Sequence, residues 1–342
     1  MESLLNGILE KRKFGRNPFS VTSMGLGLAA LGRPGYINLG HADDLKQNYD
    51  VQRMEVHAHT ILDAAWAAGI RYFDVARSYG RAEAFIGSWL AKRNIDPGLI
   101  TLGSKWGYTY TADWKVDVSA GQKHEVKEHS LAVLERQIRE SRALLGNHLD
   151  LYQIHSATLE SGVLSNQAVL TELAQLRNGG LAIGFSVSGK DQAEIIWRAL
   201  EIEFDGLPLF SSVQATWNLL EQSAAPALIT AHKMGLGIII KEALANGRLT
   251  SRNISPDFRS SMRILEAQAE AIQITIDALA LAAVMQQLFV DVTLSGAAHI
   301  DHLESNLKAL GVVWDDALEN LLEKLLESPE VYWHKRSQMA WN

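Results

Sequence analysis

The chain has 342 residues, 47% of them hydrophobic, and its formal net charge of −7 argues against a nucleic-acid-binding protein, which needs a basic face to neutralise phosphates. It contains no cysteine, which excludes disulfides, thiolate nucleophiles and cysteine metal sites. No uninterrupted apolar run reaches the roughly 18 residues of a membrane span, and the N-terminal stretch lacks the cleavage pattern of a signal peptide, so we expect a cytoplasmic protein without a membrane partner.

Eight short apolar segments have the composition of strands that are buried on both faces, as parallel strands are. In chain order they are residues 21–26, 70–75, 99–105, 149–155, 182–187, 211–216, 236–241 and 290–295. Segments with helical periodicity separate them, at residues 57–68, 81–92, 127–145, 164–178, 191–201, 221–234, 277–287 and 302–310. Eight strand-then-helix units without a polar edge strand predict an α/β fold, a (β/α)8 TIM barrel that spans residues 1–342 as one domain.

Residues 314–326 have the pattern of an extra C-terminal helix, and we expect the tail, residues 327–342, to wrap a surface groove. Three connections that follow strands, residues 32–53, 106–126 and 242–262, are longer than usual βα loops. In a barrel such loops stand at the C-terminal face of the strands, where ligands bind. The second loop carries Trp106, Tyr108, Tyr110 and Trp114. These aromatic residues either line a substrate pocket, for which we single out Trp106 and Tyr108, or simply anchor the loop.

Polar side chains stand at the ends of three consecutive predicted strands. Asp74 ends the second strand and Tyr79 follows five residues later, in FDVARSYG. Lys105 ends the third strand in TLGSKWG, and His155 ends the fourth in LDLYQIHS. Each residue alone has an ordinary structural explanation as a helix cap, a surface charge or a structural histidine. At the mouth of a barrel, however, the four can converge on one point, which makes them candidate catalytic residues.

This pattern resembles that of the aldo-keto reductases, which carry the same four residue types at the same strand ends. The segments GLGLAALG, AIGFSVSG, SVQATWNLLE and LSGAAHIDHLESNLKAL match as well, and the resemblance covers roughly residues 20–312 in order. It implies an oxidoreductase that transfers a hydride between a nicotinamide cofactor and the carbonyl or alcohol carbon of a small aldehyde, ketone or sugar. It implies NADP as the cofactor, with NAD possible.

Hydride addition leaves negative charge on the carbonyl oxygen, which then needs hydrogen-bond donors and a proton. The resemblance implies that Tyr79 delivers this proton and that the ammonium of Lys105 lowers the pKa of the phenol to make this possible. Asp74 would hold Lys105 in place, and His155 would donate a hydrogen bond to the carbonyl oxygen.

The resemblance also implies a set of cofactor contacts. Ser186 and Gln214 would bind the nicotinamide carboxamide, although Val187 replaces the family's asparagine, and the backbone of Gly27 and Leu28 would lie against the cofactor. The other expected contacts are Lys241, Leu244, Gly296, Ala297, His302 and Asn306.

Relatives often have Lys, Ser or Arg at the positions of Gly296, Ala297, Ala298 and His302, where they grip the 2′-phosphate of NADP. We therefore expect NADPH to be accepted with weak discrimination against NADH. Arginines in the seventh loop could replace the missing clamp. They are Arg248, Arg252 and Arg259.

Lys241 and Glu242 occupy the positions where many family members have a residue that stacks on the nicotinamide and a serine, so Trp217 is an alternative stacking residue. We expect no metal site, because ligand sets with recognisable spacing are absent. Two alternative functions remain. One is a catalytically slow, cofactor-sensing partner protein of the same fold, and the other is a barrel enzyme that forms a Schiff base through Lys105 or Lys241. The sequence does not indicate an oligomeric state.

Overall fold

Eight parallel strands close into a barrel in the computed structural model, which describes residues 9, 11–119 and 121–342. In barrel order they are β3 (Met24–Gly27), β4 (Tyr72–Asp74), β5 (Thr101–Trp106), β8 (Leu149–Ala157), β9 (Ala182–Val187), β12 (Ser212–Thr216), β13 (Gly237–Lys241) and β14 (Val292–Ser295). β14 pairs with β3 and closes the ring. The predicted (β/α)8 barrel is confirmed. Most of the N-terminal stretch from which we predicted that a signal peptide is absent lies outside the described residues.

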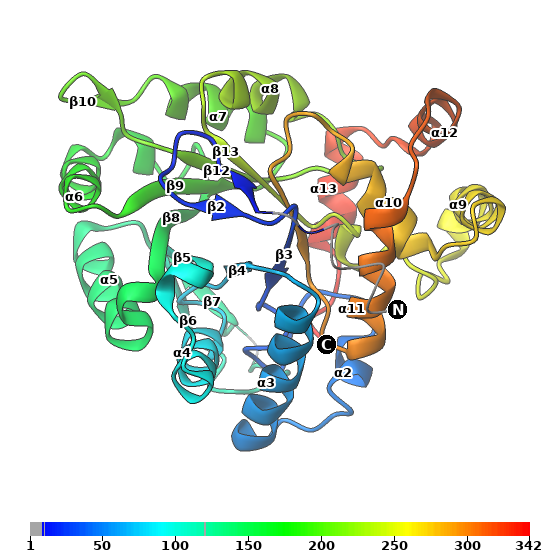
Figure 1. Ribbon diagram of the computed structural model, residues 1–342, viewed down its shortest axis with the longest axis horizontal. Coiled ribbons are helices and arrows are strands. Elements are labelled where there is room, and N and C mark those ends of the chain that lie inside the picture. The colour runs from blue at the N-terminus through cyan, green and yellow to red at the C-terminus, as the bar shows by residue number, and fades with distance from the viewer. Residues whose placement is uncertain (1–8, 10, 120) are drawn as a thin grey trace.

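Helices surround the barrel, each following a strand (Figure 1). They are α3 (Val51–Ala67), α4 (Ala82–Arg93), α5 (Leu131–Leu145), α6 (Gln167–Asn178), α7 (Gln192–Leu200), α8 (Ala225–Lys233), α10 (Ile276–Met285) and α11 (Ile300–Leu307). All eight were predicted, and the main differences are at their first residues. α3 begins six residues before the predicted start, because the Asp50 side chain accepts the N–H of Arg53 and caps the helix there.

The first predicted strand is wrong in part. Ser20 and Val21 belong to β2 (Ser20–Val21), which pairs with β1 (Arg12–Lys13) in a separate antiparallel ladder, and the barrel strand begins at Met24. Between the two strands the Thr22 hydroxyl donates to the Met24 carbonyl and accepts the N–H of Arg71. These side-chain hydrogen bonds break the continuous strand that the apolar pattern predicted.

Several elements were not predicted. They are α2 (His41–Asp44), α9 (Arg259–Ala271), α13 (Pro329–Ser337), the hairpin of β6 (Tyr108–Tyr110) and β7 (Glu125–Lys127), and the hairpin of β10 (Glu203–Phe204) and β11 (Leu207–Pro208). The predicted extra C-terminal helix is α12 (Asp316–Leu322), which stands beside α9 at one side of the barrel (Figure 1). The tail that we expected in a surface groove forms α13, and its residues Arg336 and Trp341 line the cavity that is described below.

The barrel is filled at the N-terminal ends of its strands. Phe14, Tyr72, Leu151, Ile239 and Val292 form one fully buried cluster there. Phe14 packs on Gly237 so closely that a Cβ on that glycine would lie 2.3 Å from its ring. Burying such side chains stabilises the fold by about 1.5–3 kcal/mol each, and it leaves the opposite end of the barrel for ligands.

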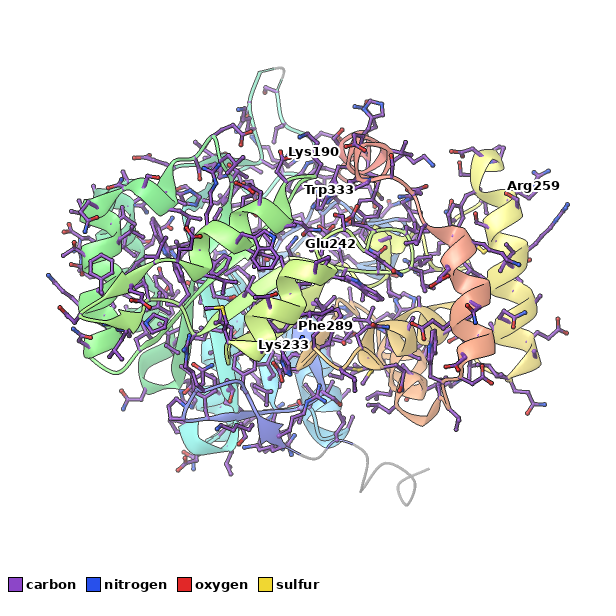
Figure 2. All side chains as sticks on the ribbon, turned by 90° about the horizontal axis from the view of Figure 1, so that it is seen from above. Lys190, Lys233, Glu242, Arg259, Phe289 and Trp333 are labelled. Atoms are coloured by element: carbon purple, nitrogen blue, oxygen red, sulfur yellow. The ribbon has the colours of Figure 1, made fainter. Side chains whose placement is uncertain are left out.

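The long connections and the tail gather at that opposite end. In Figure 2, Lys190 and Glu242, which follow strands, lie on the upper side with Trp333 of α13, and Lys233 and Phe289, which precede strands, lie below. Of the described helices, none is by itself long and apolar enough to cross a membrane, although the pair 256–271 and 276–285, bent by 85°, meets the length and composition criteria together.

Candidate active site

A cavity of about 800 Å³ lies at the C-terminal ends of the barrel strands. Strand-end residues that line it include Gly27, Asp74, His155, Lys241 and Ser295. The lining continues along the loops after β3 and β13 and reaches α10, α11 and α13. This volume is typical of a site for a small molecule or a cofactor.

Three of the four predicted catalytic residues, Asp74, Tyr79 and His155, line this cavity, and Lys105 is fully buried next to them. Lys105 forms a buried ion pair with Asp74, and its Nζ also lies 3.0 Å from the carbonyl oxygen of Val75 and 3.4 Å from the hydroxyl of Tyr79. The rings of Tyr79 and His155 are 5.5 Å apart and meet edge to face. The structure therefore brings together side chains from β4, β5, β8 and the turn before α4.

The pKa of Tyr79 is raised well above its ordinary value, first by burial and then by the negative charge of Asp74. This direction is opposite to the one that we expected from Lys105. The net pKa departs from that expectation because burial of the phenol, and then the charge of Asp74, outweigh the effect of neighbouring cations. Arg33, which the sequence analysis did not single out, lowers the pKa of Tyr79.

Burial lowers the pKa of His155 well below its ordinary value, and the cations Lys105, Lys241 and Arg33 lower it further. The imidazole is therefore neutral near pH 7 and has one donor and one acceptor nitrogen. Its Nδ1 lies 3.4 Å from the Ser78 hydroxyl. With Nδ1 bonded to this hydroxyl, Nε2 is the nitrogen that can donate to a ligand.

Two predicted carboxamide contacts are engaged within the protein. Gln214 lines the cavity and donates from Nε2 to Asp74 at 2.8 Å, so it belongs to the same network as the candidate catalytic residues. Ser186 is fully buried behind the cavity lining, and its Oγ accepts the N–H of Ser156 at 2.8 Å. Ser156 has a φ of 52° where the pairing of β8 with β9 shifts register. The Ser186 hydroxyl is therefore engaged by the backbone of this irregularity in β8.

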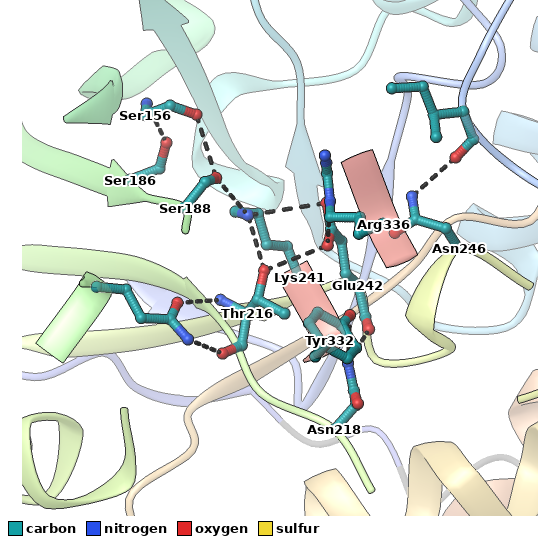
Figure 3. Close-up of polar contacts among 12 residues, drawn as sticks. Ser156, Ser186, Ser188, Thr216, Asn218, Lys241, Glu242, Asn246, Tyr332 and Arg336 are labelled. Atoms are coloured by element: carbon teal, nitrogen blue, oxygen red, sulfur yellow. Dashed lines mark hydrogen bonds and ion pairs between the residues drawn. The ribbon is translucent and has the colours of Figure 1, made fainter. Parts of the chain in front are cut away.

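Lys241 ends β13 and lies in a row of alternating charges that Figure 3 shows. Its Nζ donates to Ser188 Oγ at 3.0 Å and to Thr216 Oγ1 at 2.9 Å, and lies 3.9 Å from Glu242 Oε1. Glu242 in turn forms an ion pair with Arg336 of α13. A residue from the C-terminal segment thus becomes part of the cavity wall.

Burial and the neighbouring charges change the pKa values of Lys241 and Glu242. Burial lowers the pKa of Lys241 to about 8, although Glu242 opposes the shift. Burial would raise the pKa of Glu242, but Arg336 and Lys241 outweigh it and the pKa falls to about 2. Near neutral pH all three side chains are charged.

The far end of the cavity contains most of the other predicted cofactor contacts. The residues that line it are Leu244, Gly296, Ala297, His302 and Asn306, together with Gly27 nearer the middle, whereas Leu28 is fully buried outside the lining. A Cβ on Gly296 would meet no described atom within 4 Å, so this backbone is open to a ligand. Arg252 also lies here, 3.3 Å from the ring of His302, and forms an ion pair with Asp44.

The predicted substrate residues have different positions. Tyr108 lines the cavity with its ring 4.9 Å from that of His155. Trp106 lies outside the lining and is fully buried against His129. It follows Lys105 on β5, which faces Asp74, and alternate residues of a strand point to opposite faces. Trp217, the alternative stacking residue, also lies outside the lining and packs on Phe289.

Sequence reasoning missed several residues near the candidate catalytic side chains. They are Arg33, Tyr36, Glu125, Arg336 and Trp341, all of which line the cavity. All but Arg336 and Trp341 lie in the first two long loops, so the length of those loops was the available signal. No cluster of three or more possible metal ligands occurs within residues 9, 11–119 and 121–342.

The chain is similar to known proteins over most of its length. The aldo-keto reductase str7 of Strobilurus tenacellus is 26% identical over 360 aligned positions, which cover 97% of this chain and 96% of that protein. Pyridoxal 4-dehydrogenase of Microbacterium luteolum is 28% identical over 268 positions, covering 71% and 72%. Among solved structures, the holo form of aldo-keto reductase AKR11C1 from Bacillus halodurans has a TM-score of 0.67 at 18% identity, covering 94% of this chain and 97% of that one.

The model of the Aldo/keto reductase family matches residues 24–327, which include all eight barrel strands and the four candidate catalytic residues. The chain therefore belongs to the aldo/keto reductase family, whose members are nicotinamide-dependent oxidoreductases that act on small carbonyl compounds.

Proposed function

We propose that this protein transfers a hydride between NADPH or NADH and the carbonyl carbon of a small aldehyde, ketone or sugar, or removes it from the corresponding alcohol. The observation that carries the proposal is the meeting of Asp74, Tyr79, Lys105 and His155 at one end of the cavity. These residue types supply a proton, a hydrogen-bond donor and a charged pair at the place where negative charge develops. The comparisons give no support to a cofactor-sensing partner or to a Schiff-base enzyme.

The nicotinamide, when bound, supplies or accepts the hydride. Neutral His155 donates a hydrogen bond to the carbonyl oxygen and shares its developing negative charge. Tyr79 gives its hydroxyl proton to the same oxygen, and Lys105, 3.4 Å away, donates to the phenolate that remains. Asp74 holds Lys105 through their ion pair, and Gln214 holds Asp74 from the other side.

The far end of the cavity fits the adenosine half of the cofactor, since its backbone at Gly296 is open and the start of α11 lies beside it. We infer that both phosphorylated and unphosphorylated cofactors bind with weak discrimination. Arg252 could grip a 2′-phosphate, but Asp44 already engages it. The carboxylates that line this end also oppose a dianionic group. They are Asp44, Glu266, Glu270, Asp277 and Asp301.

The walls around Tyr79 and His155 are aromatic and polar, which favours a small substrate with hydroxyl groups or an aromatic ring. Tyr108 and Trp341 supply ring surface, and Glu125 and Thr158 supply hydrogen-bonding oxygen atoms. Pyridoxal, on which one relative acts by its name, is such a molecule. Simple aldoses and aromatic aldehydes belong to the same class.

The test is a panel of aldoses, aromatic aldehydes, ketones and pyridoxal, assayed in both directions by nicotinamide absorbance. Tyr79→Phe keeps the ring and removes the proton, so turnover should fall by about 100-fold or more while cofactor binding persists. Near-normal turnover in Tyr79→Phe would refute this mechanism. Borohydride trapping of a substrate on Lys105 or Lys241 would favour the Schiff-base enzyme instead.

A further inference from the structure

A positive charge beside Tyr79 favours the loss of its proton, and Asp74 partly offsets the charge that Lys105 supplies. Lys105 forms its ion pair with Asp74 and lies 3.0 Å from the Val75 carbonyl oxygen, whereas its distance to the Tyr79 hydroxyl is 3.4 Å. Asp74 offsets part of the charge of Lys105 at the phenol, because the two side chains form an ion pair. The pKa of Tyr79 is accordingly raised by burial and by Asp74. A second cation would make proton exchange easier.

Arg33 is placed to be that cation. Its guanidinium carbon lies 5.3 Å from the ring centre of Tyr79, 5.1 Å from that of Tyr36 and 4.8 Å from that of Trp341. Its side chain is only 3% exposed, so water screens its charge weakly. Glu125 pairs with it at 2.9 Å but is 23% exposed, so solvent weakens the compensation that this carboxylate provides.

The segment that carries Arg33 is also locked to the turn that carries Tyr79. Arg33 donates to the Ser78 carbonyl at 3.1 Å, and the N–H of Arg81 donates to the Gly32 carbonyl at 2.7 Å. The two segments lie so close that a Cβ on Gly32 would be 2.2 Å from the carbonyl oxygen of Tyr79. These contacts hold the segment of Arg33 against the turn that carries Tyr79.

We propose that Arg33 is a positioning residue for Tyr79. The guanidinium of Arg33 fixes the turn that carries Tyr79 and supplies positive charge that helps the buried phenol exchange its proton. This role rests on the hydride transfer proposed above. Arg33 lowers the pKa of Tyr79, whereas Glu125 raises it. Removing one charge or the other should therefore act in opposite directions. The remaining groups that face the phenol are Asp74, Lys105, Glu242, Tyr36 and His155.

The test compares the pH dependence of alcohol oxidation in Arg33→Gln, Glu125→Gln and Arg33→Lys. Oxidation requires the phenolate of Tyr79, so the rate rises with pH up to the pKa of this group. In Arg33→Gln this rising limb should move to higher pH by about one unit, the scale expected for a buried charge removed from about 5 Å. At a fixed pH below the plateau the oxidation rate should therefore fall about tenfold. In Glu125→Gln it should move to lower pH, and oxidation below the plateau should become faster than in the unchanged chain.

Arg33→Lys keeps the positive charge but loses the several N–H donors of the guanidinium. The rising limb of its pH–rate profile should therefore stay near that of the unchanged chain, while kcat falls. Cofactor binding, followed by the quenching of tryptophan fluorescence, should persist in all three variants and shows that each is folded. A loss of folded structure would slow oxidation in both glutamine variants. Shifts of the rising limb in opposite directions in Arg33→Gln and Glu125→Gln therefore identify an electrostatic role. Coincident limbs for Arg33→Gln and the unchanged chain, or shifts in the same direction for both glutamine variants, would overturn the role of Arg33. A lack of any carbonyl turnover in the unchanged chain would instead overturn the proposed function.

Discussion

Replacing Asp44 by asparagine should turn a weakly discriminating cofactor site into one that prefers NADPH. Asp44 is 5% exposed and forms an ion pair with Arg252, whose Nη1 also lies 3.0 Å from the second carboxylate oxygen and 3.1 Å from the carbonyls of Leu39 and Gly40. In Asp44→Asn the guanidinium keeps its place through these carbonyls but loses its counter-charge. It can then bind a 2′-phosphate, which NADPH has and NADH lacks.

The size of the gain follows from the contact that becomes possible. A hydrogen bond between charged groups contributes about 1.5–3 kcal/mol, which corresponds to about 10- to 100-fold in affinity. Arg252 is 33% exposed, so solvent and salt screen part of the interaction. We therefore expect the lower end, about a 10-fold increase in the preference for NADPH over NADH.

The assay measures Kd for both cofactors by tryptophan fluorescence, and kcat/KM for both, at constant ionic strength. The affinity for NADH should change little, since the variant site differs only toward the 2′-phosphate. A second variant, Asp44→Asn with Arg252→Gln, should lose the gain. If Asp44→Asn changes both cofactors equally, or leaves the ratio of their Kd values within about 2-fold, the assignment of Arg252 to the phosphate is refuted.

The pH dependence of this ratio gives a second check. Burial lowers the pKa of His302 below its ordinary value, and Arg252 lowers it further against the opposing effect of Asp44. His302 is therefore neutral at pH 7 and above. In the unchanged chain the ratio of NADPH to NADH affinity should be flat from pH 7 upward and should rise only in acid.

Three further predictions concern stability. The pKa of Lys241 is lowered from 10.5 to about 8. Below pH 8 the charged lysine therefore costs the folded state on the order of 3 kcal/mol of stability, and this stability is recovered as the pH rises from 8 toward 10.5. The free energy of unfolding of Lys241→Met relative to the unchanged chain should thus decline across that interval in denaturant titrations, and an increase would contradict the shift. Gly107→Ala should destabilise by on the order of 2–3 kcal/mol, since φ is 105° and a Cβ would lie 2.1 Å from His129, and an unchanged denaturation midpoint would be inconsistent with this contact. Limited proteolysis should cut within residues 32–53 and 106–126 before the barrel, with one unfolding transition, whereas two separate transitions would argue against a single domain.

The sequence by itself determined the barrel and the candidate catalytic residues. Apolar segments separated by amphipathic ones allow few arrangements, and parallel strands require that their C-terminal ends face the same way. Asp74, Lys105 and His155 each end or nearly end a strand, so their convergence follows from the topology alone. Tyr79 follows from the short turn after β4. Chain order was sufficient to predict that these residues lie close together, whereas their proposed catalytic roles came from the family resemblance.

Only the tertiary structure decided how the cavity is walled and charged. Ser186 lies on a correctly predicted strand, yet its hydroxyl accepts the N–H of Ser156 at the register shift in β8. Arg336 on α13 comes from the opposite end of the sequence to Arg33 in the loop after β3, yet both residues line the cavity. The pKa of Tyr79 also departs from the sequence-based expectation. The physical reason is common to these cases, because burial and charge depend on every segment that packs around a group, whereas a sequence pattern records only its neighbours along the chain.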